Sequence, residues 1–368
     1  MQKCFMFIDG ATPCGAGIAM VHVGKTGGST IMKLIRKDCH AWVAERWGIN
    51  GLPKGMCPGE DRPIPNESMI SKHVVAYWHE RQVPVARYTS FIVMVRNPIE
   101  RIISIFLMGH PVALIVQPGR ILNRTHAMKT AHHRAEDVER ALPLNWVHAF
   151  YSCFPTLNAF AEALPNELPR SPASKQPRCA SIGLSSVQGM NPGAGHMRWN
   201  YNFYVRPLIA WNDAREERLK AENGASCPAK TIYVLRTEQL WYDWQRVNAL
   251  LGDTEAQVPD GIHERKGTTT SRLAKASLYN RSVSQLGLAN LCRALSEEIS
   301  LYEEILFRAA NLDEGERWAD LRKVDTQCPG LQRSRIRAPS FPQLPGVAAE
   351  QPITKMHLQL TSNAAIVS

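Results

Sequence analysis

The feature that most constrains this chain is a predicted strand, a glycine-bearing turn and a helix start in close succession. The apolar run from Ile18 to Val23 has a glycine at each end and predicts a buried strand. Apolar residues then recur at helical spacing from Ser29 towards Trp47, which predicts a helix. In the turn, Gly27 and Gly28 allow the backbone to approach an oxyanion closely, and Lys25 adds a positive charge beside the helix amides. We expect this segment to bind an anion; the alternative is a tight turn with an incidental lysine.

The turn differs from the phosphate loop of ordinary nucleotide-hydrolysing enzymes. That loop has a glycine, then four residues, then its Gly-Lys pair. Counted back from Gly24 and Lys25, the position of the first glycine is Ala19, which lies inside the predicted strand. The turn is therefore too short to wrap a triphosphate, which argues against an ordinary kinase or NTPase.

A second strand-to-helix junction follows the apolar run from Ser90 to Val95. Asn97 at the N-cap, with Pro and Glu at the first and third helical positions, predicts a helix start, so Arg96 should lie at the carboxyl end of a strand. Together with Ser104 on the same helix, Arg96 could form a charge-assisted clamp for a second phosphate. The alternatives are a surface ion pair between Arg96 and Glu100 and an uninvolved hydroxyl at Ser104.

Strands and helices alternate along the rest of the chain. The remaining predicted elements are strands over 69–78 and 231–235, a helix from an N-cap at Thr237 to Leu251, a helical pattern over 137–164 broken at Pro143 and Pro155, an amphipathic helix over 286–308, and loops over 48–66 and 162–195. This alternation predicts an α/β fold in which a central, mainly parallel sheet lies between two layers of helices. In such folds ligands bind beyond the carboxyl ends of the strands.

We expect three parts along the chain: an N-terminal extension over 1–17, one α/β domain over 18–324, and a C-terminal tail over 325–368. Helical periodicity fades after about Asp325, so we expect the tail to be mostly unstructured.

The charge balance favours an anionic partner. Lys and Arg number 43 against 33 Asp and Glu, which gives a net charge of +10. The basic residues are scattered and match no homeodomain, zinc-finger or RNA-recognition pattern, so we expect no nucleic-acid partner. No window approaches the roughly 18 apolar residues of a membrane helix, so we expect membrane attachment only if an N-terminal anchor precedes this sequence.

The chain has nine cysteines and no CxxC pair. This pattern matches neither a zinc site nor a dense disulfide framework, and we expect most of the cysteines to be buried or free thiols.

Both junctions resemble motifs of one family. The segment His22–Thr30 resembles the 5′-phosphosulfate loop of sulfotransferases that use 3′-phosphoadenylyl sulfate (PAPS), particularly the Golgi carbohydrate branch related to heparan sulfate 2-O-sulfotransferase. The segment Val95–Phe106 resembles the 3′-phosphate motif of that family. The two occur in the family's order, and the resemblance extends over roughly 18–307.

The resemblance implies a P-loop-like fold and a role for each matched residue. Lys25 would contact the oxygen that bridges phosphate and sulfate, and Arg96 and Ser104 would hold the 3′-phosphate. The 5′-phosphate would be held by the loop residues Thr26, Gly27, Gly28, Ser29 and Thr30.

Two departures and one weaker match accompany the resemblance. The family usually has proline where this chain has Gly24, and aspartate where it has Asn97; we expect Gly24 to make the loop more flexible and Asn97 still to cap a helix. The stretch 263–268 resembles the basic segment that related enzymes fold over the 3′-phosphate and adenine, which implies contacts from Arg265 and Lys266; the alternative is a solvated basic loop.

Sulfuryl transfer needs a base for the proton of the acceptor hydroxyl, and histidine is the usual base near neutral pH. His73, in Lys72-His73-Val74, resembles the histidine of the Gly-His-Val segment that carries the base in the 2-O-sulfotransferase branch. The alternative is a core histidine in the predicted strand. His79 and Glu80, at the end of the same strand, are the second choice.

A metal site is not expected. His126, His132, His133 and Glu136 lie near one another in sequence, but adjacent histidines point in different directions on a helix and no second paired motif completes a ligand set. The family also needs no metal for transfer from PAPS.

The sequence thus predicts a PAPS-dependent sulfotransferase that acts on a hydroxyl, in particular of a carbohydrate, with residues 110–230 forming the acceptor cleft and 3′-phosphoadenosine 5′-phosphate (PAP) as product. The alternatives are a kinase-like nucleotide-binding enzyme on the same fold and a non-catalytic homologue that binds nucleotide or glycan. The compartment stays open between the Golgi lumen of the family and the cytoplasm, as do the oligomeric state and the acceptor.

Overall fold

The computed structural model describes residues 17–27, 30–31, 42–44, 70, 73–78, 82–109, 150–164, 178–221, 229–253 and 280–331. The chain divides into two compact units, 1–334 and 335–368, and all the described residues belong to the first. No described helix is long and apolar enough to cross a membrane.

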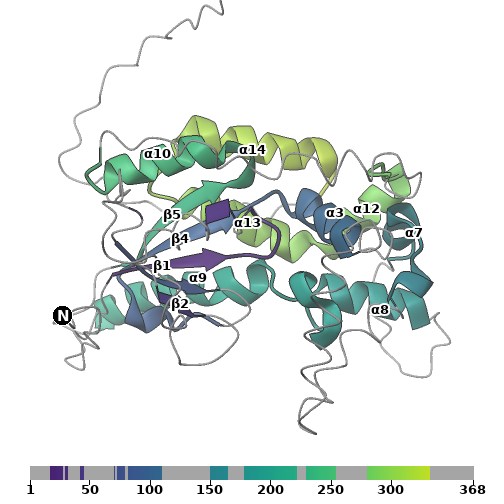
Figure 1. Cartoon of the computed structure of the whole chain (residues 1–368), viewed down its shortest axis with the longest axis horizontal. Helices are drawn as coiled ribbons and strands as arrows, with labels where there is room; N and C mark the ends of the chain where they lie inside the picture. Colours follow the sequence, from purple (N-terminus) through teal and green to yellow (C-terminus); the bar gives the residue numbers. More distant parts are fainter. Residues whose placement is uncertain are drawn as a thin grey trace, which may run out of the picture. The chain divides into compact units, whose positions relative to one another are not determined.

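A five-stranded sheet forms the centre of the described region (Figure 1). Its strands are β1 (Ile18–His22), β2 (Trp42–Ala44), β3 (Val74–Trp78), β4 (Ser90–Val95) and β5 (Thr231–Arg236). They lie in the order β2-β3-β1-β4-β5, and every neighbouring pair is parallel. The predicted α/β class with a parallel sheet is confirmed.

Both faces of the sheet are covered, because successive side chains of a strand point to opposite faces. In β1, Ala19 and Val21 join one hydrophobic cluster, whereas Ile18 and Met20 join another. The first cluster includes apolar residues of α3, α9 and α13, and the second includes those of α10. Figure 1 shows α9 and α10 on opposite sides of the sheet, as the three-layer arrangement requires.

The described helices follow the strands and complete the two outer layers. They are η1 (Val85–Arg87), α3 (Pro98–Gly109), α7 (Leu157–Glu162), α8 (Arg178–Val187), η3 (Pro192–Met197), α9 (Tyr201–Ala221), η4 (Thr237–Gln239), α10 (Leu240–Leu250), α12 (Gln285–Ala294), α13 (Ser296–Arg308) and α14 (Glu314–Gln327).

The predicted start of α3 is confirmed. The Asn97 side-chain oxygen accepts the backbone N–H groups of Ile99 at 2.9 Å and Glu100 at 3.4 Å, which caps the helix. The break expected at Pro155 is also present, between a helical segment that ends at Cys153 and α7.

Two predictions near the N-terminus are wrong in extent. The helix expected from Ser29 towards Trp47 begins at Thr30, but Trp42–Ala44 forms β2, paired with β3. The strand expected over 69–78 begins only at Val74, because Ile70 and His73 have helical backbone. The loop predicted over 48–66 lies outside the described residues.

The loop predicted over 162–195 is wrong, because α8 occupies its second half. The sequence of α8 is rich in small residues with modest helix propensity, so tertiary contacts decide its structure. Leu184 and Val187 are buried against the main core, and a disulfide joins Cys179 to Cys153. No regular element was predicted where α9 lies.

The C-terminal part is more structured than expected. The helix predicted over 286–308 divides at Leu295 into α12 and α13, and most of its apolar stripe is buried. The unpredicted α14 then continues past the domain boundary expected at 324, and Cys328 after it forms a disulfide with Cys292. The four cysteines in the described residues are thus paired in two disulfides that we did not predict, and the other five lie outside the described residues.

An ion pair inside the protein joins α3 to α13. Arg101 is fully buried, and its guanidinium donates to both oxygens of Glu298, at 2.8 and 2.6 Å. The same guanidinium donates to the backbone carbonyl of His196 in η3, at 3.1 Å, and lies over the Tyr201 ring. Arg101 thus holds η3 and the start of α9 against α3 and α13.

Glu298→Gln should strongly destabilise the protein, because it leaves the buried Arg101 charge without its carboxylate. Loss of one partner of a buried ion pair costs roughly 3–5 kcal/mol. The neighbouring Glu297 pairs with Arg206 at the surface, so Glu297→Gln should change the free energy of unfolding by less than about 1 kcal/mol. Urea unfolding of the two variants measures the difference, and equal effects would show that the buried pair has no special role.

Candidate functional site

The two predicted anion-binding junctions leave the sheet at the same edge. β1 and β4 are neighbouring parallel strands, with His22 opposite Met94, so the segments after them begin side by side. The chain passes from β1 to β2 and β3 on one side and then to β4 and β5 on the other. The junctions therefore flank the point where the strand order reverses, which is where parallel α/β sheets bind ligands.

The loop after β1 has a backbone shaped by left-handed residues. Lys25 has φ of 70° and Gly27 has φ of 83°; of the two, only glycine adopts this region without strain. The buried Thr26 hydroxyl donates to the Val23 carbonyl at 2.7 Å, and the Thr30 amide donates to the Gly27 carbonyl at 3.0 Å, which starts the helix. The Thr26 side chain therefore stabilises the loop itself.

Lys25 extends across to α3. Its ammonium group contacts the Met108 sulfur. Met108 lies one helical turn beyond Ser104, so the two share a face of α3, and both side chains are half-buried. The structure thus places the charge of the first junction against the helix of the second.

Arg96 is fixed through its backbone and has carboxylates beside its side chain. The Tyr201 hydroxyl accepts from the Arg96 amide at 2.8 Å and donates to its carbonyl at 2.5 Å. The Arg96 guanidinium lies 3.3 Å from Glu238 and 3.9 Å from Glu100. The alternative reading of Arg96 as a partner of Glu100 is therefore present, but Glu238 is the nearer carboxylate.

The η4 turn lies between the two junctions. The Thr237 hydroxyl donates to the Val95 carbonyl at 3.0 Å, so Thr237 is not the side-chain cap that we predicted for the following helix. A Cβ atom at Gly27 would lie 3.7 Å from the Thr237 methyl group, which shows how closely η4 approaches the loop after β1. Glu238, the next residue, is consequently near both loops.

Partial desolvation shifts the pKa of Glu238. Desolvation by the surrounding protein raises the pKa of this carboxyl group above its usual range, against the lowering influence of Arg96. Lys323 lowers and Asp320 raises the same pKa from α14.

A segment that the sequence did not single out forms another wall of the site. The Gly24 amide donates to the Trp199 carbonyl at 3.1 Å. A Cβ atom at Gly24 would lie 2.9 Å from the His196 carbonyl oxygen and 3.0 Å from its ring nitrogen Nδ1. Gly24 is therefore packed closely against η3, and the expected flexibility of the loop stays a prediction. The glycine at a position where the family has proline was the one sequence sign of this contact.

His73 does not lie where a base at Lys25 should be. It is exposed and immediately precedes Val74, which pairs with Ile18 at the amino end of β1. Lys25 follows the carboxyl end of β1, about 15 Å away along the strand. The predictions that His73 lies in a strand and serves as the base are therefore not supported by the geometry.

Several predicted site residues lie outside the described part of the chain. They are Gly28, Ser29, His79, Glu80, Arg265 and Lys266, together with the rejected metal cluster of His126, His132, His133 and Glu136. Within the described ranges, no three or more His, Cys, Asp or Glu residues are grouped as a metal site.

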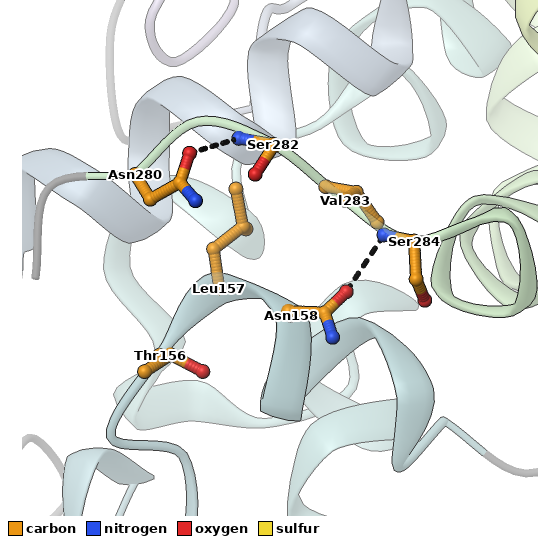
Figure 2. A pocket seen from close by; sticks show the side chains of 7 residues that line it. All are labelled: Thr156, Leu157, Asn158, Asn280, Ser282, Val283 and Ser284. Carbon is orange, nitrogen blue, oxygen red and sulfur yellow. Dashed lines mark hydrogen bonds between the residues drawn. The ribbon is translucent and has the colours of Figure 1, made fainter.

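A hollow of about 400 Å³ lies between the start of α7 and the segment before α12 (Figure 2). The side-chain amide oxygens of its two asparagines already accept backbone hydrogen bonds. Asn158 accepts from the Ser284 amide at 2.7 Å, and Asn280 accepts from the Ser282 amide at 2.9 Å. Arg281, in the same segment, pairs with Glu100 at 2.8 Å. We therefore interpret the hollow as a packing feature that supports α3.

The edge of the sheet thus combines one lysine, one arginine and a tight glycine loop. Arg96 Nε is buried and makes no hydrogen bond within the described residues, so it retains a donor for an anion. The charges of Lys25 and Arg96 come from neighbouring strands, and together they can bind two separate anionic groups of one molecule.

Substitutions of Gly24 test the closeness of this packing. Gly24→Ala should destabilise the protein by about 1–3 kcal/mol, because the new Cβ meets the His196 carbonyl. Gly24→Pro should cost about 1 kcal/mol more, since it also removes the amide bonded to Trp199. Gly315→Ala is the control, because its Cβ would meet only the Asp313 side chain at 3.4 Å. Chemical unfolding gives all three values, and a neutral Gly24→Ala would refute the close contact.

Comparison with known proteins identifies one family. Residues 15–159 match the model described as the sulfotransferase family. No curated protein and no solved structure matches the chain. The matched segment includes the loop after β1 and the junction at Arg96, whose geometry is given above. Through residues 15–159, this chain is therefore similar to the sulfotransferase family.

Proposed function

We propose that this protein transfers the sulfuryl group of PAPS to a hydroxyl group of a carbohydrate. The match of residues 15–159 to the sulfotransferase family supports sulfuryl transfer in general. The observation that favours PAPS is the convergence of two cationic junctions, at Lys25 and Arg96, on one edge of the sheet. PAPS carries separate phosphate groups at its 5′ and 3′ positions, which two such junctions can hold.

The loop after β1 is suited to the 5′-phosphosulfate end of the donor. The loop leads into a helix that begins at Thr30, and the free amides at the start of a helix favour negative charge. In an in-line displacement, negative charge accumulates on the leaving phosphate as the S–O bond breaks. The Lys25 ammonium would stabilise that charge. The assignments of Thr26 to Thr30 to the 5′-phosphate rest on the family resemblance, and the Thr26 side chain serves the loop instead.

The second junction is suited to the 3′-phosphate. Arg96 has a buried Nε donor, and Ser104 is half-buried on α3. Arg265 and Lys266 are proposed to add charge over the nucleotide, on the resemblance alone. In this proposal Lys25 acts in the chemical step, by stabilising the leaving phosphate, and Arg96 acts in binding the nucleotide.

His79 and Glu80 are the residues that we propose as the acid–base pair. β3 ends at Trp78, and its register with β1 pairs Trp78 with Val21. The chain therefore leaves β3 at the edge of the sheet that carries Lys25, whereas His73 precedes β3 at the opposite edge. A histidine beside a carboxylate is a suitable acceptor for the proton of a hydroxyl nucleophile.

A carbohydrate acceptor fits the charge of the chain and its cysteines. The net charge of +10 favours an anionic glycan. The disulfides Cys153–Cys179 and Cys292–Cys328 are typical of oxidising compartments such as the secretory pathway, where glycans are modified. We therefore propose the Golgi lumen as the site of action and residues 110–230 as the source of the acceptor cleft.

Two experiments separate this function from its alternatives. Titration with PAP and ATP distinguishes a sulfotransferase, which should prefer PAP, from a kinase-like enzyme, which should prefer ATP. Transfer of radiolabelled sulfate from PAPS to a panel of glycans and small alcohols then distinguishes an enzyme from a binding homologue. PAP binding without transfer to any acceptor would favour the homologue.

Lys25→Ala should abolish turnover while the protein stays folded, because the lost charge acts on the transition state. The rate of sulfate transfer should fall by roughly 100-fold or more. Arg293→Ala, which removes an exposed cation of α12, is the control and should retain the wild-type rate. A Lys25→Ala enzyme of normal rate would remove Lys25 from the mechanism.

Arg96→Ala should weaken binding of PAP by about 1.5–3 kcal/mol, the range for a lost hydrogen bond to a charged group. Calorimetric titration with PAP measures this change, again with Arg293→Ala as the control. An unchanged dissociation constant would move the 3′-phosphate to another site.

A further inference from the structure

We propose that Glu238 is a further residue of the nucleotide site, where its carboxylate and the 3′-phosphate compete for Arg96. The proposal rests on the proposed function, because it takes Arg96 as the 3′-phosphate ligand. It adds a residue that determines how tightly the nucleotide binds, and it predicts that binding takes up a proton.

The first support is the position of Glu238. Its oxygen Oε1 lies 3.3 Å from Arg96 Nε, closer than Glu100 at 3.9 Å. Glu100 has other partners, Arg281 at 2.8 Å and Gln327 at 3.3 Å, whereas no further ion pair of Glu238 occurs among the described residues. Glu238 is thus the carboxylate whose charge bears most directly on Arg96.

The second support is that the pair can be separated. Arg96 Nε forms no hydrogen bond with any described residue, so the contact with Glu238 is an ion pair without a directed hydrogen bond. The Glu238 side chain is 40% exposed and the Arg96 side chain 18% exposed. A phosphate could therefore reach Arg96 without breaking a hydrogen bond between Arg96 Nε and Glu238.

The third support is that Glu238 cannot move far with its backbone. Thr237 is bonded to the Val95 carbonyl and contacts the Gly27 position, so η4 is fixed between the two junctions. A phosphate bound at Arg96 would therefore have a carboxylate close by. Two such anions repel each other unless one takes up a proton.

The charged groups around Glu238 determine the direction of the pH effect. They are Arg96 between β4 and α3, and Lys323 and Asp320 on α14. Partial desolvation already raises the pKa of Glu238, and Arg96 and Lys323 lower it. When a phosphate occupies Arg96, the lowering influence of Arg96 is offset and the pKa rises further. A carboxyl whose pKa rises on binding takes up a proton, so binding should tighten as the pH falls.

Calorimetric titration with PAP tests this inference. The variants are Glu238→Gln and Glu238→Ala, which both remove the carboxylate, and Glu304→Gln, which removes the same charge elsewhere. Glu304 pairs with Arg308 just before Ala309, which bridges Ile232 near the amino end of β5, so this control lies at the opposite edge of the sheet.

We expect both Glu238 variants to bind PAP roughly tenfold more tightly than the wild type at about pH 8, and Glu304→Gln to match the wild type. The difference in PAP affinity between the wild type and the Glu238 variants should shrink towards about pH 6, where protonated glutamate resembles glutamine. Titrations in buffers of different ionisation enthalpy should show proton uptake for the wild type and less for Glu238→Gln. The comparison with Glu238→Gln removes the contribution of the phosphate's own titration.

The other outcomes contradict either this inference or the proposed function, and they differ in which of the two they contradict. If the wild type binds PAP and the Glu238 variants bind equally or more weakly, the inference is overturned while the proposed function stands. If Glu304→Gln tightens binding as much as Glu238→Gln, the effect is one of net charge and the inference again fails. If the wild type does not bind PAP, the proposed function fails and this inference falls with it.

Discussion

The site depends on one buried ion pair, between Arg101 and Glu298. Arg101 lies on the helix that the Arg96 junction begins, and its guanidinium also holds the His196 carbonyl. His196 packs closely against Gly24, and the Trp199 carbonyl accepts the Gly24 amide, at the start of the loop after β1. A single side chain thus ties the second junction to the wall that confines the first. Arg101 is fully buried, and its hydrogen bonds to Glu298 and the His196 carbonyl offset the cost of removing its charge from water.

The same edge of the sheet collects its groups from segments far apart in sequence. The loop after β1, Arg96 after β4 and η4 after β5 meet there because all the strands are parallel. A parallel sheet places every strand's carboxyl end at one edge, so charged residues that follow different strands become neighbours. The chemistry of the site is therefore a direct result of strand direction.

Much of the fold could be predicted from local patterns. β1, β4 and β5 are runs of β-branched and apolar residues, and the Asn97-Pro98 start of α3 has a capping mechanism that depends only on nearby residues. The helix α8 could not be predicted, because its small residues are helical only through burial and the Cys153–Cys179 disulfide. β2 was missed because a short edge strand is defined by its partner, β3.

The candidate site was predictable in part for the same reason. Lys25 and Arg96 follow strands directly, so sequence order alone assigned them to an edge. His73 was misplaced because the apolar pattern does not show where a strand begins, and the true start at Val74 puts it at the wrong end. The contacts of Glu238 and His196 depend on tertiary packing, which no local pattern reports.

The last described helix has a consequence for how the protein is made. The Gln327 side chain accepts from Asn97, the cap of α3, across a separation of 230 residues, and the Cys292–Cys328 disulfide follows at once. During synthesis, the junction at Arg96 leaves the ribosome long before the residues that complete its surroundings. Contacts of such long range slow folding. The contacts of Asn97 with Gln327 and of Cys292 with Cys328 can therefore form only after nearly all of residues 17–331 have been translated.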